Sequence, residues 1–307
     1  MHILVVGAGS TGGYFGGRLA QAGRDVTFLV RTQRAQQLQA HGLQIVSPHG
    51  DVTLHRKLVT TDTLGGHYDV VFLTVKAFSL MPAMEDFAPA VGPDTMILPV
   101  LNGMKHVDLL RDRFGEAAVI GCACKVATIV DEEGRIVQLS PLQDLAYGEM
   151  DGAISPRIGR LDAEIKDAGF DARLSKTIER EMWEKWILLV TLGASTCLFR
   201  GNIGQIEAVK GGSQLVLDLL DEVVRVAKAV GSTPDDAFVK NAQDALTMKG
   251  SPQTSSMYRD LQNGAFVEVD QIIGDLLERG RAAGVAMPLL RAAYVHLTVY
   301  QNRRAPV

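Results

Sequence analysis

The feature that most constrains how this chain folds is a glycine-rich turn directly after its first apolar run. Residues 2–6 read HILVV, and a GxGxxG motif and then a helical pattern follow at once. At such a strand-to-helix turn the first glycine permits the tight turn, the second lets a pyrophosphate approach the backbone, and the third allows close packing of helix on strand. Because a second strand pattern at 25–30 completes the βαβ context, the motif predicts a dinucleotide site rather than a turn without a ligand. The predicted cofactor contacts are Gly7, Ala8, Gly9, Ser10, Thr11 and Gly12.

The end of the second strand pattern indicates which dinucleotide is bound. Arg31 follows the run DVTFLV, and no carboxylate stands at that end of the strand. An acidic side chain here would bind the ribose 2′-hydroxyl of NAD, whereas an arginine accepts the 2′-phosphate of NADP. Arg34 offers a second cation one helical turn later. We therefore expect NADP or NADPH, with an ordinary surface arginine as the alternative interpretation of Arg31.

The pattern of apolar residues changes part-way along the chain. Short β-branched runs alternate with helical patterns in the first half, which is typical of βαβ units around a parallel sheet. These runs lie at 2–6, 25–30, 69–75, 95–101 and 118–121. The more polar segment 43–59 is compatible with an antiparallel hairpin. Later segments read as helices at 177–199, 204–230, 234–248, 267–283 and 288–300. The sequence thus predicts an α/β, Rossmann-type dinucleotide-binding domain at 1–176 and an all-helical domain at 177–307.

Composition and charge exclude several classes of protein. Lys and Arg number 31 against 35 Asp and Glu, so the net charge of -4 lacks the positive excess of a nucleic-acid or polybasic membrane binder. The longest uncharged apolar stretch, 186–199, is too short to span a bilayer, and the first residues lack the cationic start of a secretory signal. We expect a cytoplasmic protein. Three cysteines and scattered histidines indicate neither a disulfide scaffold nor a metal site.

Polar residues follow two further strand patterns, where open α/β sheets bind their ligands. Lys76 comes after the run at 69–75, and Asn102 stands before Gly103 after the run at 95–101. In the helical half, Lys185 lies in MWEKW at the start of the most apolar helix, and Glu268 lies in an apolar setting. A lysine in such a place has an easily lowered pKa, which suits a general acid. The alternatives are a lysine that reaches the surface and a glutamate that merely complements a helix start.

Five segments, in order and spread over almost the whole chain, resemble the 2-dehydropantoate 2-reductase (ketopantoate reductase) family. They read GAGSTGGYFG, LTVKA, LNGM, MWEKW and SSMYRDLQNGAFVEVD. The resemblance implies a Rossmann domain followed by a helical domain like that of 6-phosphogluconate dehydrogenase. It also implies NADPH-dependent reduction of 2-dehydropantoate to (R)-pantoate, a step toward pantothenate and coenzyme A. The composition leaves a monomer and a homodimer both open.

The resemblance also implies a role for each matching residue. The glycine loop at 7–12 and Lys76 contact the cofactor, Ala127 contacts it through the backbone, and Asn102 touches both cofactor and substrate. Lys185 donates the proton and binds substrate, and Ser256 binds substrate. Glu268 keeps Lys185 charged or holds the cofactor ribose. No metal is implied.

The chain departs from the family at the substrate end. Leu189 and Gly193 stand where the family has asparagines, and Gln253 replaces a third. Because an apolar site discriminates weakly for a hydroxyl, a more apolar 2-oxo acid is a rival substrate. Two other functions stay open. One is an NADP-binding sensor without turnover. The other is a 3-hydroxyacid dehydrogenase of the 6-phosphogluconate type, whose glycine-rich substrate loop Gly211-Gly212-Ser213 matches only weakly.

Overall fold

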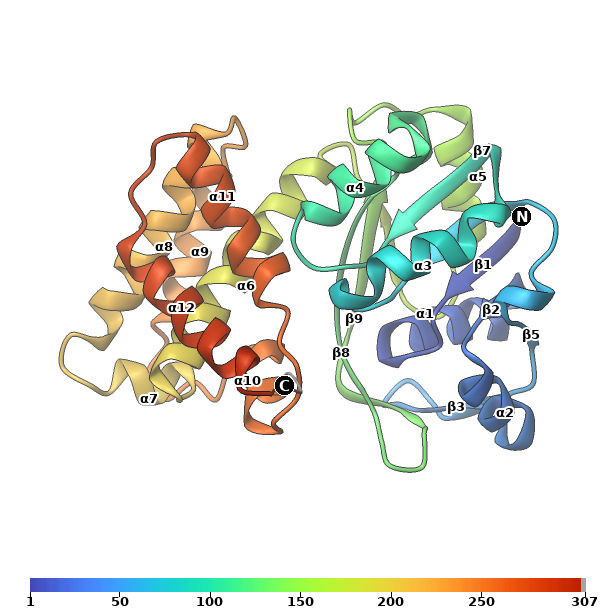
Figure 1. Ribbon diagram of the computed structural model, residues 1–307, viewed down its shortest axis with the longest axis horizontal. Coiled ribbons are helices and arrows are strands. Elements are labelled where there is room, and N and C mark those ends of the chain that lie inside the picture. The colour runs from blue at the N-terminus through green and yellow to red at the C-terminus, as the bar shows by residue number, and fades with distance from the viewer. Residues whose placement is uncertain (305–307) are drawn as a thin grey trace. The chain divides into compact units, whose positions relative to one another are not determined.

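The apolar runs of the first half pair side by side in a parallel sheet. The computed structural model describes residues 1–304, and many of its helices and strands are labelled in Figure 1. Five strands lie in the order β5-β2-β1-β6-β7, with every neighbouring pair parallel. Their bounds are β1 His2–Val6, β2 Asp25–Leu29, β5 Lys57–Val59, β6 Tyr68–Leu73 and β7 Val91–Pro99. The order reverses direction at β1, which is the topological switch point where such sheets bind their ligands.

A second sheet, which sequence patterns indicated only in part, accompanies the first. Its order is β10-β9-β3-β4, and β8 pairs with β9 in a long antiparallel hairpin. The bounds are β3 Leu43–Val46, β4 Val52–Leu54, β8 Gly121–Val130, β9 Ile136–Gly148 and β10 Asp171–Leu174. The expected antiparallel hairpin is confirmed in β3 and β4, whereas β5 joins the first sheet.

The strand expected at 118–121 is wrong. Glu116–Ala118 form a 3₁₀ turn, and Val119 makes only an isolated parallel bridge to Ile97. Only Gly121, the last residue of that run, belongs to β8. The run is apolar because it is buried beside the edge strand β7. A short buried apolar run cannot be told from a strand by its residue pattern alone.

The first helix, α1 (Ser10–Gln21), packs between the two sheets because glycines occupy both of its faces. A Cβ at Gly16 would lie 2.9 Å from Val5 and 2.8 Å from Phe28 of the first sheet, and one at Gly13 would lie 2.8 Å from Ile136 of the second. The repeated glycines therefore bring both sheets close to the helix axis. The other helices of this half are α2 Thr32–His41, α3 Leu80–Phe87, α4 Lys105–Phe114 and α5 Pro156–Ile165.

The second half of the described chain is helical, as predicted. Its elements are α6 Ile178–Phe199, α7 Ile203–Glu207, α8 Gly212–Ala229, α9 Asp236–Leu246, α10 Ser256–Gln262, a π-helix at Asp270–Gly274, α11 Asp275–Ala282 and α12 Pro288–Asn302. The single helix expected at 204–230 is wrong, because Gly211 takes a positive φ of 86° and separates α7 from α8. Helix α10 was not expected from the sequence.

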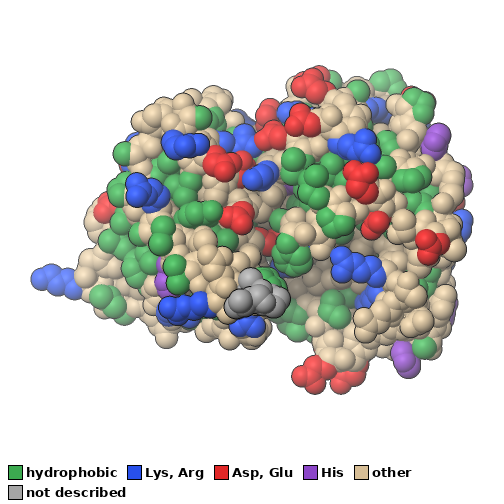
Figure 2. Space-filling model, in the orientation of Figure 1, with side chains coloured by type: hydrophobic (Ala, Val, Ile, Leu, Met, Phe, Trp, Pro, Cys, Tyr) green, Lys and Arg blue, Asp and Glu red, His purple; other side chains and the backbone are tan. Residues whose placement is uncertain are grey.

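The described chain divides into two compact units, an α/β unit followed by a helical one, which confirms the predicted fold class. Residues 1–101 and 106–179 form the first, and Asn102–Lys105 join residues from Arg180 onward in the second. None of the helices in residues 1–304 is long and apolar enough to cross a membrane. On the face drawn in Figure 2, acidic and basic side chains are interspersed.

Candidate functional site

The glycine loop between β1 and α1 is shaped by backbone contacts that only glycine permits. Gly7 has a φ of 95°, in the left-handed region, and its N–H donates to the carbonyl of Leu29 at 3.0 Å. A Cβ at Gly12 would lie 2.1 Å from Thr74 Oγ1 and 2.2 Å from the Gly7 carbonyl oxygen. The Thr74 hydroxyl donates to the carbonyls of Val6 and Gly7, each at 2.9 Å. The loop is therefore held tightly against the end of β6.

The same loop is open on the side where a pyrophosphate would bind. A Cβ added to Gly9 meets no atom within 4 Å, and Gly9 itself is exposed. Within residues 1–304 no side chain caps α1 at Gly9, and the first turn of the helix carries no acidic residue. The N–H groups at the start of α1 are thus available to an anion, together with the positive end of the helix dipole. These residues fit a dinucleotide.

Two basic residues predicted to contact the cofactor lie at the carboxyl ends of the strands on either side of β1. Arg31 follows β2 as the N-cap residue of α2, and Lys76 follows β6. Both residues are exposed. Because the carboxyl ends of parallel strands meet at one edge, both cations lie on the edge that carries the glycine loop.

Ala127 lies at an irregularity in the long hairpin. The register of β8 against β9 shifts between Val126 and Thr128, so Ala127 has no partner residue in β9. A bulge of this kind leaves backbone groups unpaired and is frequent beside active sites. The geometry suits the backbone contact that the resemblance assigns to Ala127.

In the helical unit, Asn102 belongs to a turn that packs on the π-helix and on α6. The carbonyl of Asn102 accepts a hydrogen bond from Gln271 Nε2 at 3.1 Å, and a Cβ at Gly103 would lie 2.8 Å from the Gln271 carbonyl oxygen. The indole of Trp186 donates to the carbonyl of Ile272 at 2.9 Å. Lys185 and Trp186 lie two helical turns inside α6, rather than at its start as expected from the sequence. Because Trp186 follows Lys185 directly, these contacts tie Asn102 and this part of α6 to one segment.

Lys185, Leu189 and Gly193 follow each other at helical spacing along one face of α6. Lys185 and Leu189 are half-buried. A Cβ at Gly193 would lie 2.7 Å from the terminal methyl of Met257, so the thioether occupies the space that a side chain at residue 193 would need. Beyond Lys185, this face is therefore apolar.

Ser256 is the first residue of α10, and its neighbour Ser255 is the residue that caps the helix. The Ser255 hydroxyl accepts from the N–H of Tyr258 at 2.9 Å and lies 3.0 Å from the hydroxyl of Thr196 on α6. Ser255 is buried, whereas Ser256 is half-buried and makes no side-chain hydrogen bond within the described residues. The hydroxyl of Ser256 is thus available to a ligand.

Glu268 lies half-buried two residues before the π-helix, and its carbonyl accepts from the N–H of Ile272 at 3.0 Å. The helical unit therefore brings the backbone of Glu268, the Asn102 turn and the part of α6 around Trp186 to one cluster at the π-helix. Gly193 lies two helical turns after Lys185 on α6, and Met257, the residue after Ser256 in α10, packs beside it. Gln271 was not predicted from the sequence, since it lies just outside the motif SSMYRDLQNGAFVEVD, which ends at Asp270.

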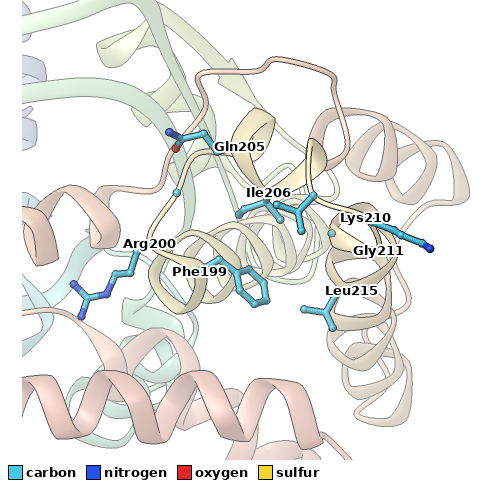
Figure 3. Close-up of a pocket in the computed structure, with 10 residues that line it drawn as sticks. Phe199, Arg200, Gln205, Ile206, Lys210, Gly211 and Leu215 are labelled. Carbon is cyan, nitrogen blue, oxygen red and sulfur yellow. The ribbon is translucent and has the colours of Figure 1, made fainter.

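A separate pocket of about 470 Å³ lies at the far end of α6 (Figure 3). Phe199, Ile206 and Leu215 form its apolar centre, and Arg200 and Lys210 extend outward on opposite sides. None of the predicted site residues lines it. In the described part of the chain, no group of three or more His, Cys, Asp or Glu could hold a metal ion.

Comparison with known proteins shows the family. Residues 3–152 match the model of ketopantoate reductase PanE/ApbA, and residues 177–301 match the model of its C-terminal region. An uncharacterised oxidoreductase of Bacillus subtilis, YkpB, is 34% identical over 304 residues, which cover 99% of this chain and 100% of that protein. The chain belongs to the PanE/ApbA ketopantoate reductase family of oxidoreductases.

Solved structures agree with this assignment. The 2-dehydropantoate 2-reductase of Geobacter metallireducens superposes with a TM-score of 0.87 at 28% identity, over 97% of this chain and 99% of that one. A D-mandelate dehydrogenase solved with NADH and anilino(oxo)acetate has a TM-score of 0.87 at 20% identity, over 99% of both chains, and shares the fold.

Proposed function

We propose that this protein is an NADPH-dependent reductase of a 2-oxo acid, with 2-dehydropantoate as the leading substrate and (R)-pantoate as the product. Residues 1–176 bind the dinucleotide, and residues 177–307 supply the acid and the substrate-binding groups. The observation that carries the proposal is the glycine loop. It is closed by backbone contacts at Gly12 and open at Gly9, in a chain whose family reduces ketopantoate. The fold alone selects neither the 2-oxo acid nor the dinucleotide, because a D-mandelate dehydrogenase with NADH shares it.

The residues of the helical unit have distinct roles in this proposal. Bound NADPH supplies the hydride. A cationic Lys185 donates a hydrogen bond, and then the proton, to the substrate carbonyl oxygen as negative charge develops there. The Asn102 amide orients that carbonyl, and the Ser256 hydroxyl binds the substrate carboxylate. Glu268 keeps Lys185 charged or binds the cofactor ribose. Lys76 and Arg31 provide positive charge for the phosphates.

Lys185→Ala tests the proton donor. We expect turnover to fall by about 10²- to 10⁴-fold, the usual contribution of a positioned acid, while NADPH binding stays intact. Steady-state kinetics and a fluorescence titration of NADPH measure the two effects separately. Lys240→Ala, which removes an exposed lysine of α9, is the matched control. Near-normal turnover of the Lys185 variant would refute its role, and a purified protein that binds NADPH but reduces no 2-oxo acid would indicate the sensor instead.

A more apolar 2-oxo acid is the second candidate substrate, and Leu189 and the Gly193–Met257 contact favour it. We propose a panel of 2-dehydropantoate and 2-oxoisovalerate with NADPH, and NADH as the cofactor control. Leu189→Asn is expected to shift kcat/KM toward 2-dehydropantoate by about tenfold or more, because an amide can bind the substrate hydroxyl.

Leu188→Asn is the matched control, since this half-buried residue lies next to Leu189 on a different face of α6. If the unchanged protein prefers 2-dehydropantoate by orders of magnitude, Leu189 does not relax its specificity.

A further inference from the structure

Two arginines one helical turn apart at the start of α2 are held in opposite ways. Arg31 is exposed, and its side chain makes no hydrogen bond or ion pair within residues 1–304. Arg34 is half-buried and makes three hydrogen bonds. Arg31 is therefore free to meet a ligand, whereas Arg34 belongs to the framework of the site.

The guanidinium of Arg34 joins three segments of the α/β unit. Its Nε donates to the carbonyl of Ala8 in the glycine loop at 3.2 Å. Its Nη1 donates to the carbonyl of Gly134 at 3.0 Å, in the turn between β8 and β9, and to Gln37 Oε1 at 2.5 Å on α2. Gln37 in turn donates to the carbonyl of Glu133 at 3.1 Å. Through these contacts Arg34 links the hairpin turn to the glycine loop.

The charge of Arg34 is not neutralised by these partners. All three acceptors are neutral oxygens, and no carboxylate pairs with Arg34 among the described residues. Its Nη2 is buried without a hydrogen-bond acceptor in the same part of the chain. Burial also lowers the pKa of Arg34. A net positive charge of low hydration therefore lies against the loop that faces the dinucleotide, where a phosphate is the anion best able to compensate it.

We propose that Arg34 is a positioning residue that sets the preference for the 2′-phosphorylated dinucleotide. Its charge adds to that of Arg31 at the end of β2, where a 2′-phosphate is bound in folds of this type, and its hydrogen bonds hold Ala8 and the hairpin turn together. The proposal rests on the proposed dinucleotide function and adds to it a residue of this chain that discriminates NADPH from NADH.

Binding of NADPH and NADH to the full chain, measured by calorimetry or nicotinamide fluorescence without substrate, tests the proposal. For Arg34→Gln we expect the NADPH Kd to rise by about tenfold or more and the NADH Kd to rise much less. Arg34→Lys keeps the charge but loses the planar guanidinium with its several donors. The ratio of the two Kd values should therefore change in the same direction as in Arg34→Gln, and to a smaller extent. Higher salt should reduce the difference between the unchanged protein and Arg34→Gln.

Arg24→Gln is the matched control. Arg24 precedes β2, at the opposite end of the strand from the ligand edge, and it also donates to one backbone carbonyl and has one buried nitrogen without an acceptor. Its replacement should leave the ratio of Kd values unchanged.

The outcomes separate a structural role from discrimination. A purely structural role would weaken both dinucleotides equally, because the glycine loop binds the pyrophosphate that they share. Equal loss, or no loss, overturns the proposal for Arg34. If Arg34→Gln does not fold, Arg34→Lys decides, and an unchanged ratio overturns the proposal. If the unchanged protein binds neither dinucleotide, the proposed function itself fails.

Discussion

Two glycines of the loop between β1 and α1 have the same side chain but opposite structural requirements. Gly12 is surrounded by the Thr74 hydroxyl and the Gly7 carbonyl, so that no Cβ fits. Gly9 has ordinary extended backbone angles, φ −81° and ψ −163°, and empty space around it. Gly12 is thus required by the packing of the loop, whereas nothing in the described fold requires a glycine at residue 9, as expected if Gly9 serves the proposed binding of a dinucleotide.

Replacing each of these glycines by alanine should separate folding from binding. Gly12→Ala is expected to lower the free energy of unfolding by about 1–3 kcal/mol or more, because the new methyl overlaps backbone that cannot move away cheaply. Gly9→Ala should leave that free energy within about 0.5 kcal/mol and still weaken dinucleotide binding, because its methyl occupies the space of the pyrophosphate. Denaturant unfolding and NADPH titration measure the two quantities. Undiminished NADPH affinity in Gly9→Ala would contradict the placement of the pyrophosphate.

At the scale of elements, α1 determines how closely the two sheets approach. A Cβ at Gly16 would overlap Val5 and Phe28 of the first sheet, and a Cβ at Gly13 would overlap Ile136 of the second. The β8–β9 hairpin is consequently held beside the glycine loop by packing at Gly13 as well as by Arg34.

A double-mutant cycle tests this packing. Gly13→Ala should destabilise the protein by about 1–3 kcal/mol, because the methyl would lie 2.8 Å from Ile136 Cδ1. Ile136→Ala should cost about 2–5 kcal/mol alone, since it leaves a cavity. The double variant should cost less than the sum, because the methyl then fills that cavity. Gly13→Ala combined with Leu246→Ala, a buried position in the other unit, should be additive within about 0.5 kcal/mol. Additivity of the first pair would mean that the contact does not limit the approach of the second sheet.

At the scale of the whole molecule, the net charge of -4 is small for 307 residues. We therefore expect the pH dependence of stability to come from particular ion pairs rather than from the net charge. Glu149, directly after β9, accepts from Arg157 Nε at 2.8 Å and from the Ser155 hydroxyl at 2.5 Å. The Arg157 guanidinium lowers the pKa of Glu149 below its ordinary value of 4.5, and Arg157 also donates to the carbonyl of Ala117. This largely buried pair holds the start of α5 against the end of β9.

Glu149→Gln is expected to lower the free energy of unfolding by about 1–3 kcal/mol at neutral pH. Since the folded pKa is lowered, the contribution of Glu149 is complete above its ordinary pKa and is lost as pH falls through the folded pKa. Urea unfolding between about pH 7 and pH 3 should therefore show the difference between the two proteins constant at first and then shrinking in acid. Glu133→Gln, at an exposed ion pair with Arg135, is the control and should change stability by less than about 0.5 kcal/mol. A difference that grows toward acid would have the wrong sign.

Local patterns predicted the parts of the fold that depend on neighbouring residues. The βαβ start, the parallel sheet and the helical second half follow from apolar periodicity and glycine placement, and the structure confirms them. The long β8–β9 hairpin was missed because its strands mix polar and apolar residues, so neither strand shows the clear apolar pattern by which strands are predicted. The break at Gly211 was missed because an isolated glycine is tolerated in a helix pattern.

The same division holds for the candidate site. The sequence predicts most candidate site residues, since each stands at a characteristic place in a local pattern. These are the GxGxxG motif, Arg31, Lys76, Asn102, Lys185, Ser256 and Glu268. Other features of the site are contacts between residues far apart in the chain. Arg34 links Ala8 to Gly134, Gln271 holds the Asn102 turn, and Met257 fills the space beside Gly193. Periodicity and motif spacing record which local backbone is favourable. Which distant side chains share a volume depends on how the sheets and helices pack, and packing leaves no pattern in neighbouring residues.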